Sequence, residues 1–368
     1  VELIQEYRNG YAISYDDHRT ILSSVFGVIR VEGVVAANEW AQLQETNSAA
    51  ALREGRTTLE NVVWYDSTTA NTVVDEGVRE TEPVTFNVST SVDLIGKAVT
   101  LYVEKTTILS NSVVLGVASN DNMNVINGTV ENQGTVADYL DGTGVTVDED
   151  TEYYVNYGYF NSEDAAIDWI NEYYHTETPG DDFNLNGIEV EVIDNNDDGI
   201  AEYVLYLQET LSEINRYNER NETVSFYTPD RDSRDDLDGT HSTLTVDMAN
   251  VVADENVAFE AEELVLYVQY GGRTYLSAPE IVTGTMARID RDRDNELYIT
   301  VNDTQYYQSY ILDAASLVDV DVTRFIIDEA RTAVGFDTTY DFILDSNGYV
   351  VAFRPAEEIV TNYALVLD

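Results

Sequence analysis

Short runs of β-branched and aromatic residues, separated by Asn, Asp and Gly, recur along the chain and constrain its fold most strongly. Residues 297–301 (Leu-Tyr-Ile-Thr-Val) are followed by an Asn-Asp pair and a second run of the same kind. Residues 339–344 and 349–353 flank an Asn-Gly pair in the same way. Asn-Gly between two such runs is a strong signal for a β-hairpin. The pattern predicts a mainly β protein built of tandem small β-sandwich or β-barrel domains.

Helical periodicity is scarce. The best candidate is Ser162–Tyr174, in which a serine that can cap the helix precedes two acidic residues and the apolar residues share one face. A shorter candidate, Ala37–Gln44, has two apolar residues three positions apart. We therefore expect one or two short helices beside the strands.

The 368 residues suggest two or three domains, at roughly 150 residues each. Two stretches have the composition of linkers: a Gly-rich one at 141–144 and an Asp-rich one at 228–242. We predict an N-terminal β domain (1–141), a middle β domain with a short helix and an Asp-rich loop (142–235), and a C-terminal β domain (236–368).

The formal net charge is −50, which sets the partners that the chain can have. Such a charge excludes a nucleic-acid binder held by phosphate contacts and a surface that docks on anionic lipid. No apolar run reaches the ~18 residues of a membrane span, so we expect no membrane insertion.

Lys97 and Lys105 are the only lysines. Strong acidity with little lysine favours an extracellular, cell-surface setting rich in salt or divalent cations, where screening limits self-repulsion; replacement of lysine by arginine through GC content is the alternative.

One acidic loop has the spacing of a metal site. Residues 194–202 read D-x-N-x-D-G-x-x-E between two predicted strands. Oxygens at alternate positions of a tight loop converge, glycine permits the left-handed turn, and oxygen-only sites suit Ca²⁺. A helix–loop–helix calcium site would need a glutamate where Leu205 stands. The alternative is an Asx-rich turn without an ion. The candidate ligands are the side chains of Asp194, Asn196, Asp198 and Glu202 and the carbonyl of Ile200.

Signals for an enzyme are weak. The chain has no G-x-S-x-G or H-E-x-x-H motif and no Gly-rich phosphate loop. His18, His175 and His241 are far apart in sequence, and there is no cysteine. Carboxylate pairs carry no information among 69 acidic residues. We therefore predict that the protein is not an enzyme.

Several segments, taken in order, resemble a known family. They include the Gly-Val-Val strand before residues 35–40, residues 94–102, residues 151–156, the Asp194 loop, and the Leu-Asp-x-Asn-Gly-Tyr hairpin at 344–349. Together they resemble the β-rich ectodomain that follows the anchoring repeats in S-layer-homology-domain surface-layer proteins. The chain contains no anchoring repeat of that kind. The resemblance implies a self-assembling surface-layer or filament subunit stabilised by Ca²⁺, with any contact to cell-wall polysaccharide made through regions outside this chain.

The expected function is therefore a structural subunit of an extracellular self-assembling surface layer or filament. Its main partner would be a second copy of itself, joined through sheet edges or through the terminal runs Val1–Tyr7 and Ala364–Leu367 into a homopolymer. The alternative is that each terminal run pairs within its own domain. The alternatives are a Ca²⁺-dependent adhesin or carbohydrate-binding ectodomain, and a polysaccharide-active enzyme. The first would present an exposed aromatic platform, and the second would need a cleft with paired carboxylates.

Overall fold

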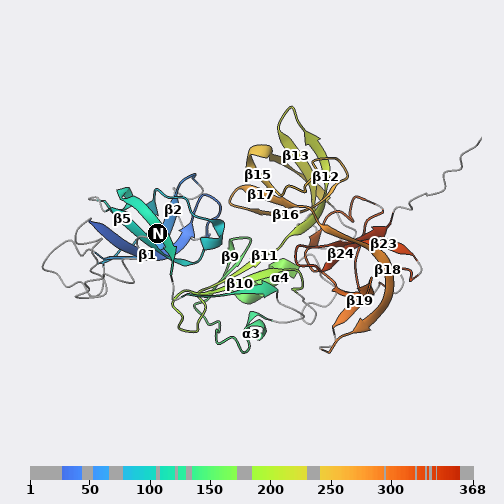
Figure 1. The fold of residues 1–368 in the computed structure, drawn as a ribbon, viewed down its shortest axis with the longest axis horizontal. Helices are drawn as coiled ribbons and strands as arrows, with labels where there is room; N and C mark the ends of the chain where they lie inside the picture. Colours follow the sequence, from blue (N-terminus) through green and yellow to red (C-terminus); the bar gives the residue numbers. More distant parts are fainter. Residues whose placement is uncertain are drawn as a thin grey trace, which may run out of the picture.

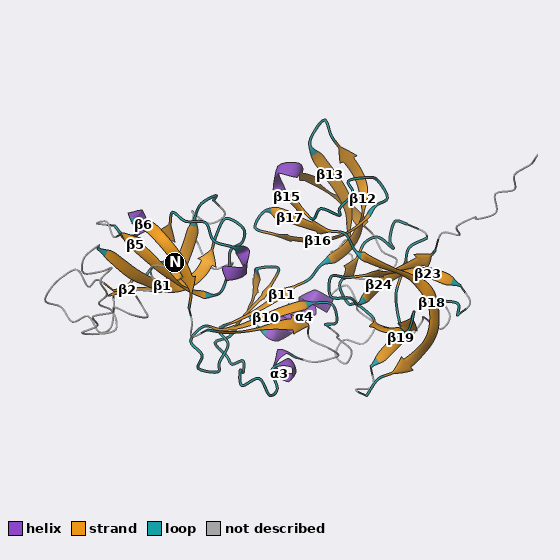
Figure 2. Cartoon of the chain, in the orientation of Figure 1, coloured by secondary structure: helices purple, strands orange, loops and turns teal. Residues whose placement is uncertain are grey.

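The described residues form four separate β-sheets, which confirms the mainly β fold. Figure 1 shows the first sheet at one end of the long axis and the fourth sheet at the other, and Figure 2 shows how little helix lies between them. The computed structural model describes residues 27–43, 53–65, 78–104, 108–120, 123–129, 135–171, 185–229, 241–293, 296–319, 321–327, 330, 334–336 and 338–356.

The first two sheets are formed by strands between residues 28 and 207. The first sheet has the order β3-β2-β1-β5-β6, with β4 on β2, and the second has the order β7-β10-β11-β8-β9. The strands of the first are β1 (Val28–Ala37), β2 (Thr57–Tyr65), β3 (Val78–Arg79), β4 (Val84–Phe86), β5 (Ala98–Glu104) and β6 (Val113–Ser119). Those of the second are β7 (Asn124–Thr129), β8 (Glu152–Val155), β9 (Gly158–Phe160), β10 (Glu189–Asp194) and β11 (Tyr203–Leu207), accompanied by helices α3 (Val136–Tyr139) and α4 (Glu163–Asn171).

The other two sheets use the C-terminal half. The third has the order β14-β13-β12-β16-β17-β15, with β21 on β12, and the fourth has the order β20-β19-β18-β23-β24-β22. The strands of the third are β12 (Thr210–Asn218), β13 (Thr223–Pro229), β14 (His241–Asp247), β15 (Val251–Ala253), β16 (Leu264–Tyr270), β17 (Arg273–Ser277) and β21 (Leu312–Asp313). Those of the fourth are β18 (Glu280–Arg291), β19 (Leu297–Val301), β20 (Thr304–Tyr307), β22 (Thr323–Arg324), β23 (Thr339–Leu344) and β24 (Val350–Pro355).

Both hairpins expected from the turn residues are present. β19 pairs with β20 across Asn302 and Asp303, whose φ angles of 51° and 66° are left-handed. That geometry matches the right-handed twist of the flanking strands, and Asn and Asp adopt it at low cost. β23 pairs with β24 across a turn that contains Gly348 at φ 85°.

The second sheet is buried on both faces because its strands alternate between two cores. Ile193, Tyr203 and Leu205 pack into the core of the first sheet. Val192 and Val204 point the other way, into a core shared with α4. Since successive residues of a strand face opposite sides, a sheet covered on both sides needs apolar residues at nearly every position. This explains the uninterrupted apolar run of β11. In β10 the acidic residues Glu189 and Glu191 alternate with Val190 and Val192, and Glu191 is paired with Lys97.

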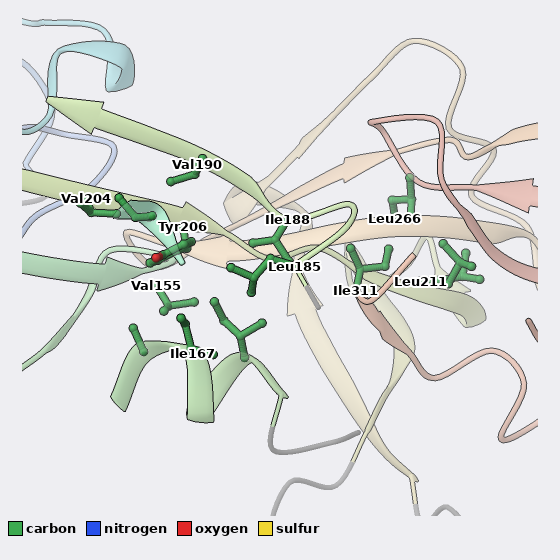
Figure 3. Close-up of a cluster of buried hydrophobic side chains, with 14 of the residues drawn as sticks. Val155, Ile167, Leu185, Ile188, Val190, Val204, Tyr206, Leu211, Leu266 and Ile311 are labelled. Atoms are coloured by element: carbon green, nitrogen blue, oxygen red, sulfur yellow. The ribbon is translucent and has the colours of Figure 1, made fainter. Parts of the chain in front are cut away.

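The shared core joins the second, third and fourth sheets. Figure 3 shows Val190 and Val204 facing Ile167 of α4, while Leu211 of β12 and Ile311 continue the same cluster. The sheets are therefore joined by buried apolar side chains as well as by the chain itself.

Only two residues, Gln208 and Glu209, separate the second sheet from the third. The backbone N–H of Gln208 donates to Asn156 Oδ1 at 2.9 Å, and its carbonyl accepts from Asn156 Nδ2 at 3.1 Å. Its buried side chain donates to the carbonyl of Ile170 at 3.1 Å. Glu209 accepts a hydrogen bond from Ser346 of the β23–β24 hairpin at 2.7 Å. Hydrogen bonds therefore fix this two-residue link to the second sheet and α4 through Gln208, and to the fourth sheet through Glu209.

One of the two expected helices forms. Ser162 Oγ accepts from the N–H of Ala165 at 3.2 Å at the start of α4, while positions 172–174 of the expected helix lie outside the described residues. The helix expected at Ala37–Gln44 is wrong. β1 runs through Ala37, and Asn38 Oδ1 then accepts from the N–H groups of Trp40 and Ala41, which forms a turn instead.

The boundaries between the sheets do not coincide with the linker-like stretches at 141–144 and 228–242. β7, which precedes residue 142, pairs with β10 of the second sheet. The stretch around 235 lies in the segment 230–240, outside the described residues, and the strands that flank it, β13 and β14, pair with each other. The predicted division into domains stays a prediction. None of the helices in the described ranges is long and apolar enough to cross a lipid bilayer.

Candidate functional site

The candidate metal loop is the turn of the β10–β11 hairpin. Asp194 ends β10, and the N–H of Glu202 donates to the carbonyl of Ile193 at 2.9 Å to close the loop. Asp197 and Gly199 have left-handed φ angles of 58° and 87°. The glycine therefore fills the role that the sequence assigns to it, because it allows the chain to turn back on itself.

Three of the predicted ligands hold successive turns of this loop. The carboxylate of buried Asp194 accepts from the N–H groups of Asn196 (3.3 Å) and Gly199 (3.0 Å). Asn196 Oδ1 accepts from the N–H of Asp198, and Asp198 Oδ1 accepts from the N–H of Ile200, both at 2.9 Å. These hydrogen bonds form successive Asx turns along the loop.

The Glu202 carboxylate accepts hydrogen bonds from two residues of the loop. Its Oε2 accepts from the N–H of Asn195 at 2.7 Å and its Oε1 accepts from Asn196 Nδ2 at 3.1 Å. Burial raises the pKa of Glu202, and the charges of Asp194 and Asp198 raise it further. Hydrogen bonds therefore link Asp194, Asn196 and Glu202. Asn196, Asp198 and Ile200 are exposed, whereas Asp194 is buried.

The donor set of this loop fits a hard cation. All five predicted ligands offer oxygen, and each carboxylate has about four lone-pair sites, of which the turn contacts use one or two. Within the part of the chain that the structure describes, no three His, Cys, Asp or Glu side chains are grouped to hold a metal ion. Calcium binding by these residues stays a prediction.

Asn195, between the predicted ligands, has a role that the spacing of the motif did not reveal. Its Oδ1 accepts from the N–H of Ala98 at 2.6 Å, and its Nδ2 donates to the carbonyl of Gly96 at 2.9 Å. Asn195 is buried, and a Cβ on Gly96 would lie 3.0 Å from Ile193 Cδ1. The loop is thus docked on the backbone at the start of β5, where it joins the first sheet to the second. No local sequence signal marks this contact.

A second acidic hairpin, between β23 and β24, makes a comparable contact. Buried Asp345 accepts from the N–H groups of Asn347 and Tyr349, both at 2.9 Å. Asn347 Nδ2 then donates to the carbonyl of Gly187 at 3.0 Å, next to β10. Burial raises the pKa of Asp345. A carboxylate shapes each hairpin, and a neighbouring carboxamide docks it on another sheet.

One of the two lysines forms an ion pair between the first and second sheets. Lys97 Nζ lies 3.0 Å from Oε1 and 3.1 Å from Oε2 of Glu191 on β10. Burial raises the pKa of Glu191, while the charge of Lys97 lowers it. In a chain with so few cations, this lysine compensates a carboxylate at a largely buried junction.

Residues of three sheets meet in a cluster, called here the three-sheet contact. It consists of the aromatic residues Trp40, Tyr157 and Tyr270 together with Gly271 and Arg273. The guanidinium of Arg273 lies 4.0 Å from the ring centre of Trp40, and the rings of Tyr157 and Tyr270 meet edge to face at 4.9 Å. A Cβ on Gly271, at φ 60°, would lie 1.5 Å from the carbonyl oxygen of Trp40. The tip of the β16–β17 hairpin therefore rests directly on the first sheet's Trp40 turn.

The histidines show no catalytic grouping in the described part of the chain. His241, at the start of β14, is exposed and lies edge to face with Tyr227 at 5.0 Å. His18 and His175 lie outside the described residues. The expectation that the protein is not an enzyme stays a prediction.

No protein-family model matches this chain. A search of curated proteins finds no match either. The resemblance to surface-layer ectodomains therefore rests on the sequence segments alone.

Proposed function

We propose that this chain is a structural subunit of an extracellular self-assembling surface layer or filament, and that Ca²⁺ stabilises it. The observation that carries the proposal is that buried contacts between the sheets hold the successive described parts of the chain against one another. The second sheet shares one core with the first sheet and another with the third and fourth. A subunit built in this way transmits its orientation from one end to the other, which a regular array requires.

The acidity of the chain supports a dependence of assembly on cations. At net charge −50, neighbouring copies repel each other over a screening length that shrinks to about 10 Å at 0.1 M salt. A divalent ion between carboxylates reduces that repulsion and binds only where the carboxylates are held together. The Asp194 loop holds three candidate ligands in hydrogen-bond contact in the folded state.

Electron microscopy and light scattering of the purified protein test the proposal. We expect ordered sheets or filaments with Ca²⁺ and salt, and dispersed subunits after dialysis into low salt with EGTA. A chain that stays monomeric in Ca²⁺ at every salt concentration, at protein concentrations up to the solubility limit, would contradict assembly as its function.

Thermal melting separates the role of calcium from assembly. Added Ca²⁺ should raise the melting temperature of the wild type, because an ion that binds only the folded state stabilises it. Asp198→Ala removes one predicted ligand and should reduce that rise. Asp197→Ala is the matched control, since Asp197 is in the same loop but outside the alternating set. Equal melting temperatures with EGTA and Ca²⁺ for wild type would refute the calcium site and leave assembly to be judged by microscopy.

A further inference from the structure

A cavity opens where the second and fourth sheets face each other. Its volume is about 590 Å³, within the ~300–1,000 Å³ range of small-molecule sites. It is bounded by β7 and β20, which are edge strands of the second and fourth sheets, and by the β23–β24 hairpin. The lining residues are Asn127, Gly128, Thr129, Glu189, Gln305, Tyr306, Tyr307, Ser346, Asn347, Gly348 and Tyr349.

Carboxamides from both sheets line the cavity. Asn127 on β7 and Gln305 on β20 are exposed, and neither side chain is hydrogen-bonded to another residue of the described part of the chain. Asn347 Nδ2 already donates to Gly187, which fixes the direction of that side chain. A carboxamide offers both a donor and an acceptor, so this lining can pair with a ligand that presents the same two functions.

Tyrosine side chains supply the apolar part of the lining. Tyr306, Tyr307 and Tyr349 are half-buried, and the hydroxyl of Tyr349 lies 3.3 Å from Thr129 Oγ1, so it connects the two walls. A tyrosine ring offers an apolar face beside a hydroxyl that prefers a hydrogen-bond partner. Such a ring packs against the C–H face of a ligand that carries hydroxyls at its rim.

The charge of the lining narrows the class of ligand. Glu189 is the single ionisable acid or base other than tyrosine among the lining residues, and no Lys, Arg or His is present there. An anionic ligand would find no cation and would face the net charge of −50. A purely apolar ligand would leave the carboxamides without partners after displacing their water.

We propose that this cavity binds a neutral oligosaccharide. Sugar rings combine C–H faces, which pack on tyrosine, with several hydroxyls, each a donor and an acceptor, which pair with carboxamides and with the Glu189 carboxylate. The site is formed by two sheets at once, so a ligand in it would contact both. Binding of this kind goes beyond the structural role proposed above and can be measured on dispersed, unassembled chains.

The experiment uses a glycan array that carries neutral, N-acetylated and acidic glycans, followed by calorimetric titration of the best ligand in low salt. We expect neutral or N-acetylated glycans to bind and acidic ones to be rejected. Asn127→Ala combined with Gln305→Ala should weaken binding about tenfold, since each removes one hydrogen bond to the ligand. Binding of acidic glycans alone, or of no glycan on the array, would overturn the proposal.

Matched variants connect the binding to this cavity. Tyr349→Phe keeps the ring and should leave affinity within about threefold, whereas Tyr349→Leu removes the ring and should weaken binding about tenfold. Asn250→Ala, on an exposed turn of the third sheet, is the control for an unrelated carboxamide. Circular dichroism confirms that each variant is folded. If the folded variants at Asn127, Gln305 and Tyr349 bind the glycan with the affinity of the wild type, the binding site lies elsewhere and this assignment is refuted.

Discussion

The contact of Gly271 with Trp40 predicts that two adjacent glycines respond very differently to the same substitution. Both Gly271 and Gly272 have left-handed φ angles, 60° and 72°. A methyl group at Gly272 meets nothing within 4 Å, whereas at Gly271 it would lie 1.5 Å from the carbonyl oxygen of Trp40. Alanine at either position costs about 1–2 kcal/mol of backbone strain. The difference in unfolding free energy between Gly271→Ala and Gly272→Ala therefore measures the contact with Trp40 alone.

The extra cost at Gly271 follows from the three-sheet contact. To reach an ordinary separation of about 3.4 Å, the hairpin tip must withdraw by about 2 Å from Trp40. That movement removes the packing of Arg273 on Trp40, worth about 0.5–1 kcal/mol, and disturbs the Tyr157–Tyr270 pair, worth about 0.5–1.5 kcal/mol. We expect Gly271→Ala to be less stable than Gly272→Ala by about 1–2.5 kcal/mol.

Urea unfolding followed by tryptophan emission measures this difference, since Trp40 is at the contact. Small-angle scattering of both variants in buffer adds a structural readout, with a larger radius of gyration expected for Gly271→Ala. Equal unfolding midpoints and equal scattering profiles for the two variants would refute the reasoning, because the shared strain would then account for the entire effect.

Three further predictions follow from other contacts between and within sheets. Asn195→Ala should lower the free energy of unfolding by about 2–4 kcal/mol, because it leaves two backbone groups of the first sheet unpaired; Asn196→Ala, in the same loop but exposed, should cost less than about 1 kcal/mol in the same urea titration. Lys97→Met should cost about 2–4 kcal/mol by leaving Glu191 uncompensated, and adding Glu191→Gln should recover stability; a double variant no more stable than the single one would contradict the ion pair's role. Burial raises the pKa of Asp313, so the folded state binds its proton more tightly than the unfolded chain and stability should rise as pH falls from 7 toward that raised pKa. Asp313→Asn should flatten this part of the pH profile in urea unfolding at pH 7, 6 and 5, and an unchanged slope would show that Asp313 contributes nothing to it.

Local turn chemistry explains which parts of this fold the sequence predicts. Asn302-Asp303 and the Asn-Gly pair at 347–348 signal hairpins by their residue types alone. Asn302, Asp303 and Gly348 adopt the left-handed φ angles that these turns require. The Asp194 loop can also be predicted from its sequence, because its turns are local. They are formed by side chains that accept hydrogen bonds from N–H groups two to five residues ahead. Asn38 shows the limit, because its two turn contacts outweigh the helical spacing of the residues that follow.

Contacts between sheets were not predictable from the sequence. Asn195 pairs with Gly96, 99 residues away, and nothing in its neighbours distinguishes it from Asn196. β8 pairs in parallel with β11 after a crossover that includes α4, so sequence proximity does not reveal the strand order. The cavity is equally hidden, because Asn127 and Gln305 are brought together only by the packing of two sheets. Each of these features depends on tertiary arrangement, which single-chain patterns do not encode.

The two-residue link between the second and third sheets has a mechanical consequence. A pull along the chain would enter the third sheet through Gln208, whose backbone and side chain are bonded to Asn156 and Ile170. β11, just before the link, is held between β8 and β10, so its hydrogen bonds would be loaded together in shear rather than opened one at a time. Tension would therefore be shared by the whole of the second sheet before either neighbour could separate. A chain connected in this order resists extension, a property that the proposed surface-layer subunit would need in order to keep its spacing under tension.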